Sequence, residues 1–280
     1  MQTHQPQQTV IILSALLLLL SSCSLSVAPS GQLISFWNAS NESNPAKIEH
    51  SAWQAILDAY LDANHPSGIN RFDYGSLKAN STDNQKLKDY LSSLKKLDPR
   101  TYSKAEQKAY WINLYNALTV HLVVNHYPVK SIKHIDSPLG LGGPWDKKLL
   151  KIQEHRLTLN NIEHGILRPI WNDNRIHYAV NCASIGCPNL ASEAYTAENM
   201  EIVLDKGAKD YVNHTRGVQF HPDGRLLVSS IYEWYKVDFG GTDASVIAHL
   251  QKYANHDLAN RLQSYKGSID DQYNWELNKP

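Results

Sequence analysis

The chain has 280 residues, 42% of them hydrophobic, and its 27 basic and 27 acidic residues give a formal net charge of zero. This length provides enough core for one large domain or two small ones, and we expect one. Proteins that bind nucleic acids or other charged polymers usually carry an excess of the opposite charge. This chain has no such excess, so neither is an expected partner.

The first 23 residues predict an export signal. Residues 10–20 (VIILSALLLLL) form an apolar run too short to span a bilayer, and small residues follow it. The motif LSSC at residues 20–23 resembles the bacterial lipoprotein cleavage box, which implies a lipid on Cys23 as the only membrane attachment. We therefore expect a lipid-anchored protein of the cell envelope, at the periplasmic face of the outer membrane. The n-region has no Lys or Arg, so cleavage without a lipid stays open.

A tether and two helices follow the signal. Residues 24–46 are rich in Ser, Asn, Gly and Pro, which predicts a flexible tether and a single folded domain over residues 47–280. Apolar residues at helical spacing predict helices over residues 53–61 and 87–97, with a short strand and turn between them.

The third predicted helix has the clearest boundaries. Ser103 and Glu106 form a capping box, an apolar stripe follows, and Pro128 marks the end. The glycine-rich loop after it, residues 137–145 (SPLGLGGPW), lacks the Lys-Ser/Thr and helix of a phosphate-binding loop. We expect this loop to border a cleft.

The second half of the chain mixes strands and short helices, which predicts an α+β fold with a central, mainly antiparallel sheet between N-terminal and C-terminal helices. The predicted elements are a hairpin over 149–159, a short helix capped by Asn160, a strand over 175–181, a hairpin over 217–230, and helices over 243–253 and 259–265.

Two cysteines five positions apart, Cys182 and Cys187, follow the predicted strand 175–181. Three interpretations stay open. The tight turn between the cysteines permits a disulfide, which an oxidising compartment favours. Zinc could bind both thiolates together with His164 or His177, although the spacing matches no common finger. Alternatively, Cys182 is a nucleophile whose pKa is lowered by an imidazolium or by backbone amides in the turn.

Two histidines are candidates for the general base. In a regular strand His177 lies on the face opposite Cys182, so His177 fits better as a buried histidine that binds a backbone carbonyl. His164 lies four residues before Arg168 on one helical face, where two cations repel. The pair is stable if His164 is neutral, as a general base must be, or if an anion lies beside both. We therefore expect His164 to be the base.

Glu163 adjoins His164 but lies about 100° around the helix from it, so the two are not neighbours on one helical face. It is either the N3 capping carboxylate of the helix that begins at Asn160 or a catalytic residue. Asn113 and Asn116, on the side of the third helix away from its apolar stripe, need specific partners because a buried unpaired amide costs about 1–3 kcal/mol. They either orient a ligand or bind the backbone of the hairpin.

Several motifs in the same order resemble domain-of-unknown-function family 547. They are YWINLYNALTVHLV from residue 110, NNIEHGILR from 160, RIHYAVNCASIGCPNL from 175, YTAENM from 195, IYEWYKVDFGG from 231 and YNWELN from 273. The family is distantly similar to papain-like and transglutaminase-like cysteine enzymes. This resemblance implies catalytic roles for Cys182, His164, Glu163 and His177, and substrate-binding roles for Asn113, Asn116 and Arg168. Plant members often carry serine at the position of Cys187, so the resemblance does not imply an obligatory disulfide.

These observations lead to three expected functions. The first is a cysteine-dependent hydrolase or acyl transferase without a cofactor, acting on a peptide, an amide or a small thiol peptide. The second is a module that binds an anionic ligand at Arg168 and His164 without turnover, as a sensor in the envelope. The third is a zinc-binding protein. The sequence leaves the substrate and the oligomeric state open.

Overall fold

The structure is a computed structural model, and it describes residues 31–136 and 142–280. The predicted signal, the lipidation residue Cys23 and residues 137–141 of the glycine-rich loop lie outside the described residues. The α-helices are α1 (Ser51–Tyr60), α2 (Tyr74–Ala79), α3 (Ser81–Lys96), α4 (Lys104–His126), α5 (Arg168–Trp171), α6 (Ile176–Ala179), α7 (Met200–Val212), α8 (Ile231–Trp234), α9 (Asp243–Tyr253) and α10 (His256–Ser264).

Shorter helical segments and strands complete the fold. A π-helix, η5, spans Asn161–Leu167. The 3-10 segments are η1 (Ser35–Asn38), η2 (Pro99–Thr101), η3 (Ile132–His134), η4 (Pro144–Asp146) and η6 (Lys236–Phe239). The strands are β1 (Leu61–Asp62), β2 (Arg71–Phe72), β3 (Leu150–Ile152), β4 (His155–Leu157), β5 (Val218–Phe220), β6 (Leu226–Ser229) and β7 (Ile269–Gln272).

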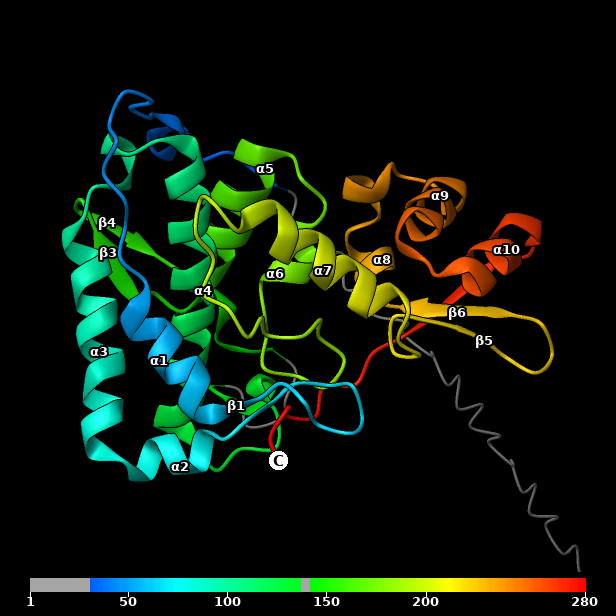
Figure 1. Cartoon of the computed structure of the whole chain (residues 1–280), viewed down its shortest axis with the longest axis horizontal. Helices are drawn as coiled ribbons and strands as arrows, with labels where there is room; N and C mark the ends of the chain where they lie inside the picture. Colours follow the sequence, from blue (N-terminus) through cyan, green and yellow to red (C-terminus); the bar gives the residue numbers. More distant parts are fainter. Residues whose placement is uncertain (1–30, 137–141) are drawn as a thin grey trace, which may run out of the picture.

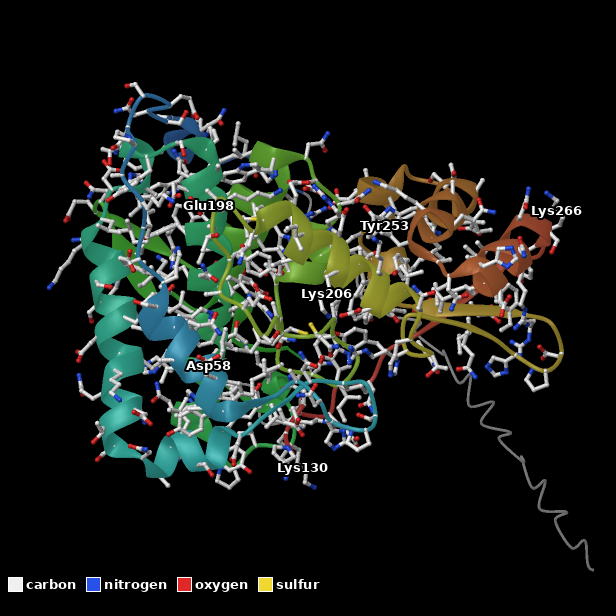
Figure 2. The ribbon with its side chains drawn as sticks, in the orientation of Figure 1. Asp58, Lys130, Glu198, Lys206, Tyr253 and Lys266 are labelled. Atoms are coloured by element: carbon white, nitrogen blue, oxygen red, sulfur yellow. The ribbon has the colours of Figure 1, made fainter. Side chains whose placement is uncertain are left out.

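Helix α4 is the centre of the larger core. Most of its 23 residues are buried, because α1, α3 and the β3–β4 hairpin lie on one side of it and α6 and α7 on the other (Figure 1). Side chains fill the space between these elements (Figure 2). The helix begins as predicted, with Ser103 Oγ accepting from the Glu106 N–H at 3.3 Å. The Glu106 carboxylate, however, accepts from Ile48 N at 2.9 Å and does not close a capping box.

The predicted central sheet is wrong for the described residues, which form three small sheets: antiparallel β1–β2, antiparallel β3–β4, and β5–β6–β7 with an antiparallel and a parallel pair. The hairpins over 149–159 and 217–230 are confirmed. The predicted strand 175–181 instead contains the short helix α6. The apolar residues of this segment are all buried, and a short buried apolar run is as compatible with a helix as with a strand. The result is a mainly helical α+β fold.

The packed body includes residues upstream of the predicted boundary at residue 47. Ile34 N donates to Gly165 O at 2.8 Å, and Trp37 in η1 is fully buried against Trp111 of α4. The part of the predicted tether that the structure describes is therefore attached to the core near η5.

A second core cluster joins α7, α8, α9 and α10 to the three-stranded sheet, at the other end of the molecule from α3 (Figure 1). From β7 the chain returns towards the larger core, where Leu277 N donates to Lys130 O at 3.0 Å and Phe72 N donates to Asn278 O at 2.9 Å. This return places residues 273–275 between the two clusters. No helix within residues 31–136 and 142–280 is both long and apolar enough to cross a bilayer.

Candidate active site

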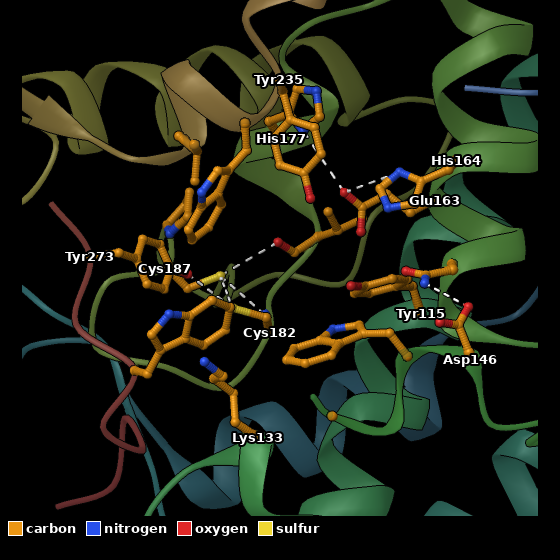
Figure 3. Close-up of a pocket in the computed structure, with 18 of the residues that line it drawn as sticks. Tyr115, Lys133, Asp146, Glu163, His164, His177, Cys182, Cys187, Tyr235 and Tyr273 are labelled. Atoms are coloured by element: carbon orange, nitrogen blue, oxygen red, sulfur yellow. Dashed lines mark hydrogen bonds and ion pairs between the residues drawn. The ribbon is translucent and has the colours of Figure 1, made fainter. Parts of the chain in front are cut away.

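A pocket of about 390 Å³ opens where the two core clusters meet, with Val180 from the larger cluster and Ile231 from the second in its wall. Its lining is rich in aromatic residues, namely Tyr115, Trp145, Trp234, Tyr235, Tyr273 and Trp275. Figure 3 shows the polar lining in two groups, with both cysteines on one side and Glu163 and the two histidines on the other.

The first group, which we name the thiol cluster, consists of Cys182, Ser184, Cys187 and Tyr273. Both cysteines are free thiols. The Cys182 sulfur lies 3.1 Å from the Cys187 sulfur, 3.1 Å from Ser184 Oγ and 3.0 Å from Tyr273 Oη. The expected imidazole partner is not among these contacts. The sulfur is surrounded by neutral S–H and O–H groups.

Hydrogen bonding gives the two thiols opposite properties. The pKa of Cys182 is lowered because Cys187, and then the Ser184 and Tyr273 hydroxyls, stabilise the thiolate more than burial opposes it. The pKa of Cys187 is raised well above its ordinary value by burial and by the Cys182 thiolate beside it. Of the two thiols, Cys182 therefore loses its proton more readily.

The backbone of the cysteine turn is fixed by side-chain amides. Asn181 Oδ1 accepts from Ala183 N at 2.8 Å, and Asn181 Nδ2 donates to Pro188 O at 2.8 Å. Ala183 has φ 60°, an uncommon conformation for a residue other than glycine and one that concentrates at functional sites. These bonds hold Cys182 at the pocket wall.

Gly186 brings the C-terminal segment onto the turn. Its N–H donates to Asn274 O at 2.8 Å, and a Cβ atom at Gly186 would lie 2.8 Å from the Asn274 backbone. Only glycine permits this approach. Because Tyr273 precedes Asn274, this contact places the Tyr273 hydroxyl beside the Cys182 sulfur.

The asparagines of α4 bind backbone and do not line the pocket. Asn116 accepts from Asn181 N at 2.8 Å and donates to Ala179 O at 2.9 Å, so it holds the segment that leads into Cys182. Asn113 makes the same pair of bonds with the N–H and carbonyl of Tyr195. Both amides bind backbone, but the backbone is that of Ala179, Asn181 and Tyr195 and not that of the predicted hairpin. Asn116 is a positioning residue for the cysteine turn.

The second group, which we name the imidazole cluster, consists of Glu163, His164, Arg168, His177 and Asp238. Arg168 donates to Asp238 through Nε at 2.6 Å and Nη2 at 3.0 Å, and His177 Nε2 lies 2.7 Å from Asp238 Oδ2. Burial raises the pKa of Asp238, but the hydrogen bonds from His177 and Arg168 outweigh this effect and hold that pKa well below its usual range. Asp238 is an anion beside Arg168, and an anion was one of the two alternatives that the spacing of His164 and Arg168 left open. The sequence did not identify Asp238 as that anion. With Asp238 in place, the anion beside Arg168 is part of the protein itself.

His164 is neutral, as predicted, but its geometry does not suit a base. Burial, followed by the charge of Arg168, lowers its pKa more than Glu163 raises it. Arg168 Nη1 lies 3.0 Å from His164 Nδ1, and because guanidinium groups only donate, Nδ1 is the acceptor and the ring proton lies on Nε2. Accepting a second proton would break this bond.

His177 has the geometry that a base needs, in contrast to what the predicted strand implied. Residues 176–179 form helix α6 rather than a strand, so alternation does not apply and His177 lines the same pocket as Cys182. Because ionised Asp238 accepts from Nε2–H, Nδ1 is the ring nitrogen that remains to take or give a proton. That atom is buried without a hydrogen-bond partner in the described part of the chain and lies 3.9 Å from Glu163 Oε1. Tyr235 stacks on the ring with centroids 4.2 Å apart.

Glu163 is a pocket residue and not a helix cap. Asn160 makes no capping bond, whereas Thr158 and Asn161 exchange bonds at the start of this helical segment. Glu163 Oε1 lies 3.9 Å from the Nδ1 atoms of both His164 and His177. The segment η5 is a π-helix, a rare conformation that is frequent at functional sites. The predicted capping role of Asn160 is wrong, since its amide donates to Asp146 Oδ1 instead.

Within residues 31–136 and 142–280, no three His, Cys, Asp or Glu side chains converge in a group that could hold a metal ion. The proposed zinc ligands are divided between the thiol cluster and the imidazole cluster (Figure 3). The zinc interpretation therefore has no ligand set in the described residues.

The fold and site define a mainly helical α+β protein with a free dithiol and a histidine–carboxylate pair in one pocket. Residues 99–212 match the family model described as "Protein of unknown function, DUF547", so the chain contains a DUF547 domain over these residues. No curated protein and no solved structure matches the chain. The matched range includes α4, the cysteine turn and both histidines, whereas Asp238 and Tyr273 lie beyond it.

Proposed function

We propose that this protein is a cysteine-dependent hydrolase or acyl transferase of the cell envelope, with Cys182 as nucleophile and His177 as acid–base group. One observation carries the proposal: the Cys182 sulfur and the His177 imidazole line one pocket. Each is held by partners that suit its role, hydroxyl and thiol donors for the sulfur and Asp238 for the imidazole.

The reaction follows from these partners. His177 Nδ1 first takes the proton of the Cys182 thiol, and the Cys182 sulfur attacks an acyl carbon and forms a carbon–sulfur bond. The bond to the leaving group breaks as His177 gives that proton from Nδ1 to the leaving group. Asp238 stabilises the imidazolium through Nε2–H. Water or another acceptor then attacks the thioester while His177 Nδ1 takes its proton, and the Cys182 thiolate is released.

The pocket indicates the class of substrate. Its volume is within the range of small-molecule sites, and its aromatic lining suits an apolar or planar group. Lys133 also lines it, with Nζ 5.2 Å from the Trp275 ring, where an ammonium can meet a carboxylate. A peptide, an amide or a small thiol peptide with a free carboxylate fits these features. The lipid on Cys23 would hold the enzyme at the periplasmic face of the outer membrane.

The proposal is tested with an activated ester such as p-nitrophenyl acetate. We expect a burst of nitrophenol, an acyl group on Cys182 in the mass spectrum, and slow turnover. His177→Ala lowers turnover by about 10²–10⁴, whereas His164→Gln, which keeps an acceptor for Arg168, lowers it far less. Iodoacetamide should label Cys182 well below pH 8. Slow, equal labelling of both thiols near pH 8.5 together with an absent burst contradicts the proposal.

A further inference from the structure

The thiol cluster contains a second cysteine that acyl transfer does not use. Both cysteines line the pocket, with Cys182 partly buried and Cys187 buried. Their sulfurs are 3.1 Å apart, and a disulfide bond needs about 2 Å. Acyl transfer by Cys182 requires only one sulfur, so it does not explain why the Cys187 thiol lies in contact with that sulfur.

We infer that Cys182 and Cys187 form a thiol–disulfide exchange couple that reduces a small disulfide bound in this pocket. This activity goes beyond the proposed acyl transfer and shares with it only the nucleophilic sulfur of Cys182. The substrate class is a disulfide of a low-molecular-weight or peptide thiol, small enough for a pocket of about 390 Å³.

The exchange takes two steps. The Cys182 thiolate attacks one sulfur of the substrate disulfide, so a Cys182–substrate disulfide forms and the other half leaves as a thiolate. That thiolate takes the proton of Cys187, whose sulfur then attacks the Cys182 sulfur and expels the second half as a thiolate. The two cysteines lose two electrons and become a disulfide, and the substrate gains them as one thiol and one thiolate.

The local geometry assigns the two roles. Cys182 faces the pocket, and its sulfur lies within hydrogen-bond distance of Cys187 Sγ, Ser184 Oγ and Tyr273 Oη, which lower the pKa of this thiol as an attacking thiol requires. Cys187 is positioned to resolve the mixed disulfide, because the Cys182 N–H donates to its sulfur at 3.0 Å and can stabilise its charge when it deprotonates. Asn116 and Asn181 hold the turn, so both sulfurs stay within reach of each other.

The experiment treats the reduced, purified protein with glutathione disulfide and measures intact mass, with peptide mapping to assign the site. The wild type should lose the mass of two hydrogens, carry no lasting adduct, lose iodoacetamide labelling at Cys182, and recover on reduction with dithiothreitol. Cys187→Ser should accumulate one glutathionyl group on Cys182, and Cys182→Ser should form no internal disulfide.

Ester acylation of the same samples separates this inference from the proposed function. A wild type that keeps a stable adduct, or that does not react while its ester acylation is intact, overturns the exchange couple alone. Formation of the internal disulfide without ester acylation overturns only the acyl-transfer proposal. Because the wild type decides both outcomes, neither depends on the folding of a variant.

Discussion

The thiol cluster and the imidazole cluster face the same pocket but are built by different means. The sulfur of Cys182 is held by neutral donors, and most of these lie within the short turn 182–187. The imidazole cluster is held by charges: Asp238 binds Arg168 and His177, and these residues come from three separate segments. A thiolate can thus be stabilised without an imidazole beside it, which leaves the His177 Nδ1 atom free for proton transfer to a substrate.

Removal of the charge at the centre of the imidazole cluster should have the largest effect. Asp238→Asn removes the carboxylate charge that binds both the Arg168 guanidinium and His177 Nε2, and we expect the free energy of unfolding to fall by roughly 3–5 kcal/mol. Urea unfolding measures this loss. Ester turnover should also fall, because His177 loses the acceptor for its Nε2–H.

Asp173→Asn is the matched control for this variant. Asp173 binds the buried Lys108 at 2.7 Å and Arg175 at 2.8 Å, and none of the three lines the pocket. We expect Asp173→Asn to lose about as much stability as Asp238→Asn. At a temperature where both variants are folded, Asp173→Asn should retain its ester turnover. Equal turnover of the Asp238 and Asp173 variants would show that Asp238 has only a structural role.

The reactivity of the thiol cluster should depend on the hydrogen bonds that hold the cysteine turn, and not on a nearby charge. Asn116→Ala removes the partners of Asn181 N and Ala179 O, which costs roughly 1–3 kcal/mol and loosens the turn before Cys182. Asn113→Ala removes the same two bonds at Tyr195, away from the sulfur, at a similar cost. Iodoacetamide labelling of Cys182 should change in the first variant and not in the second. The same labelling rate in both would refute a positioning role for Asn116.

The two clusters also differ in how far the sequence predicts them. The sequence predicts the cysteine turn as a candidate site because Cys182, Ser184 and Cys187 lie within six residues of one another. The spacing of His164 and Arg168 indicated that His164 could be neutral. The role of His177 depended on whether residues 176–179 form a strand or a helix, which a short buried run does not decide.

Long-range partners were beyond the sequence argument. The spacing of His164 and Arg168 left open a neutral imidazole or a nearby anion, and only the contact between Arg168 of α5 and Asp238 of η6 identifies that anion. Tyr273 reaches Cys182 only because the chain returns from β7 past Gly186. The helices α1, α3 and α4 and two hairpins were predicted because their apolar spacing is local, whereas the central sheet was wrong because α4 occupies the core.

Acidification should weaken the imidazole cluster through His164. Its pKa in the folded protein is lowered, mainly by burial, so below about pH 6.5 the unfolded chain binds a proton that the folded protein does not. Stability should therefore fall as the pH decreases from 6.5, by at most about 1.4 kcal/mol per pH unit for this group. Urea midpoints across this range, compared with His164→Gln, isolate the contribution. If the urea midpoint of His164→Gln falls with pH as steeply as that of the wild type, His164 does not cause the loss of stability.

The smallest expected effect concerns the hydroxyl donors of the thiol cluster. Tyr273→Phe removes one of three hydrogen bonds to the Cys182 sulfur, and a bond to a charged group is worth about 1.5 kcal/mol, or roughly one pKa unit. The pH profile of iodoacetamide labelling should shift upwards by about that amount. Tyr211→Phe is the control, because its hydroxyl donates to Gly186 O and Ser229 Oγ and does not contact the sulfur. An upward shift in the control but not in Tyr273→Phe would mean that the turn, and not the hydroxyl, sets the acidity of Cys182. A shift confined to Tyr273→Phe means that neutral donors stabilise the thiolate, and it leaves His177 free to act on the substrate.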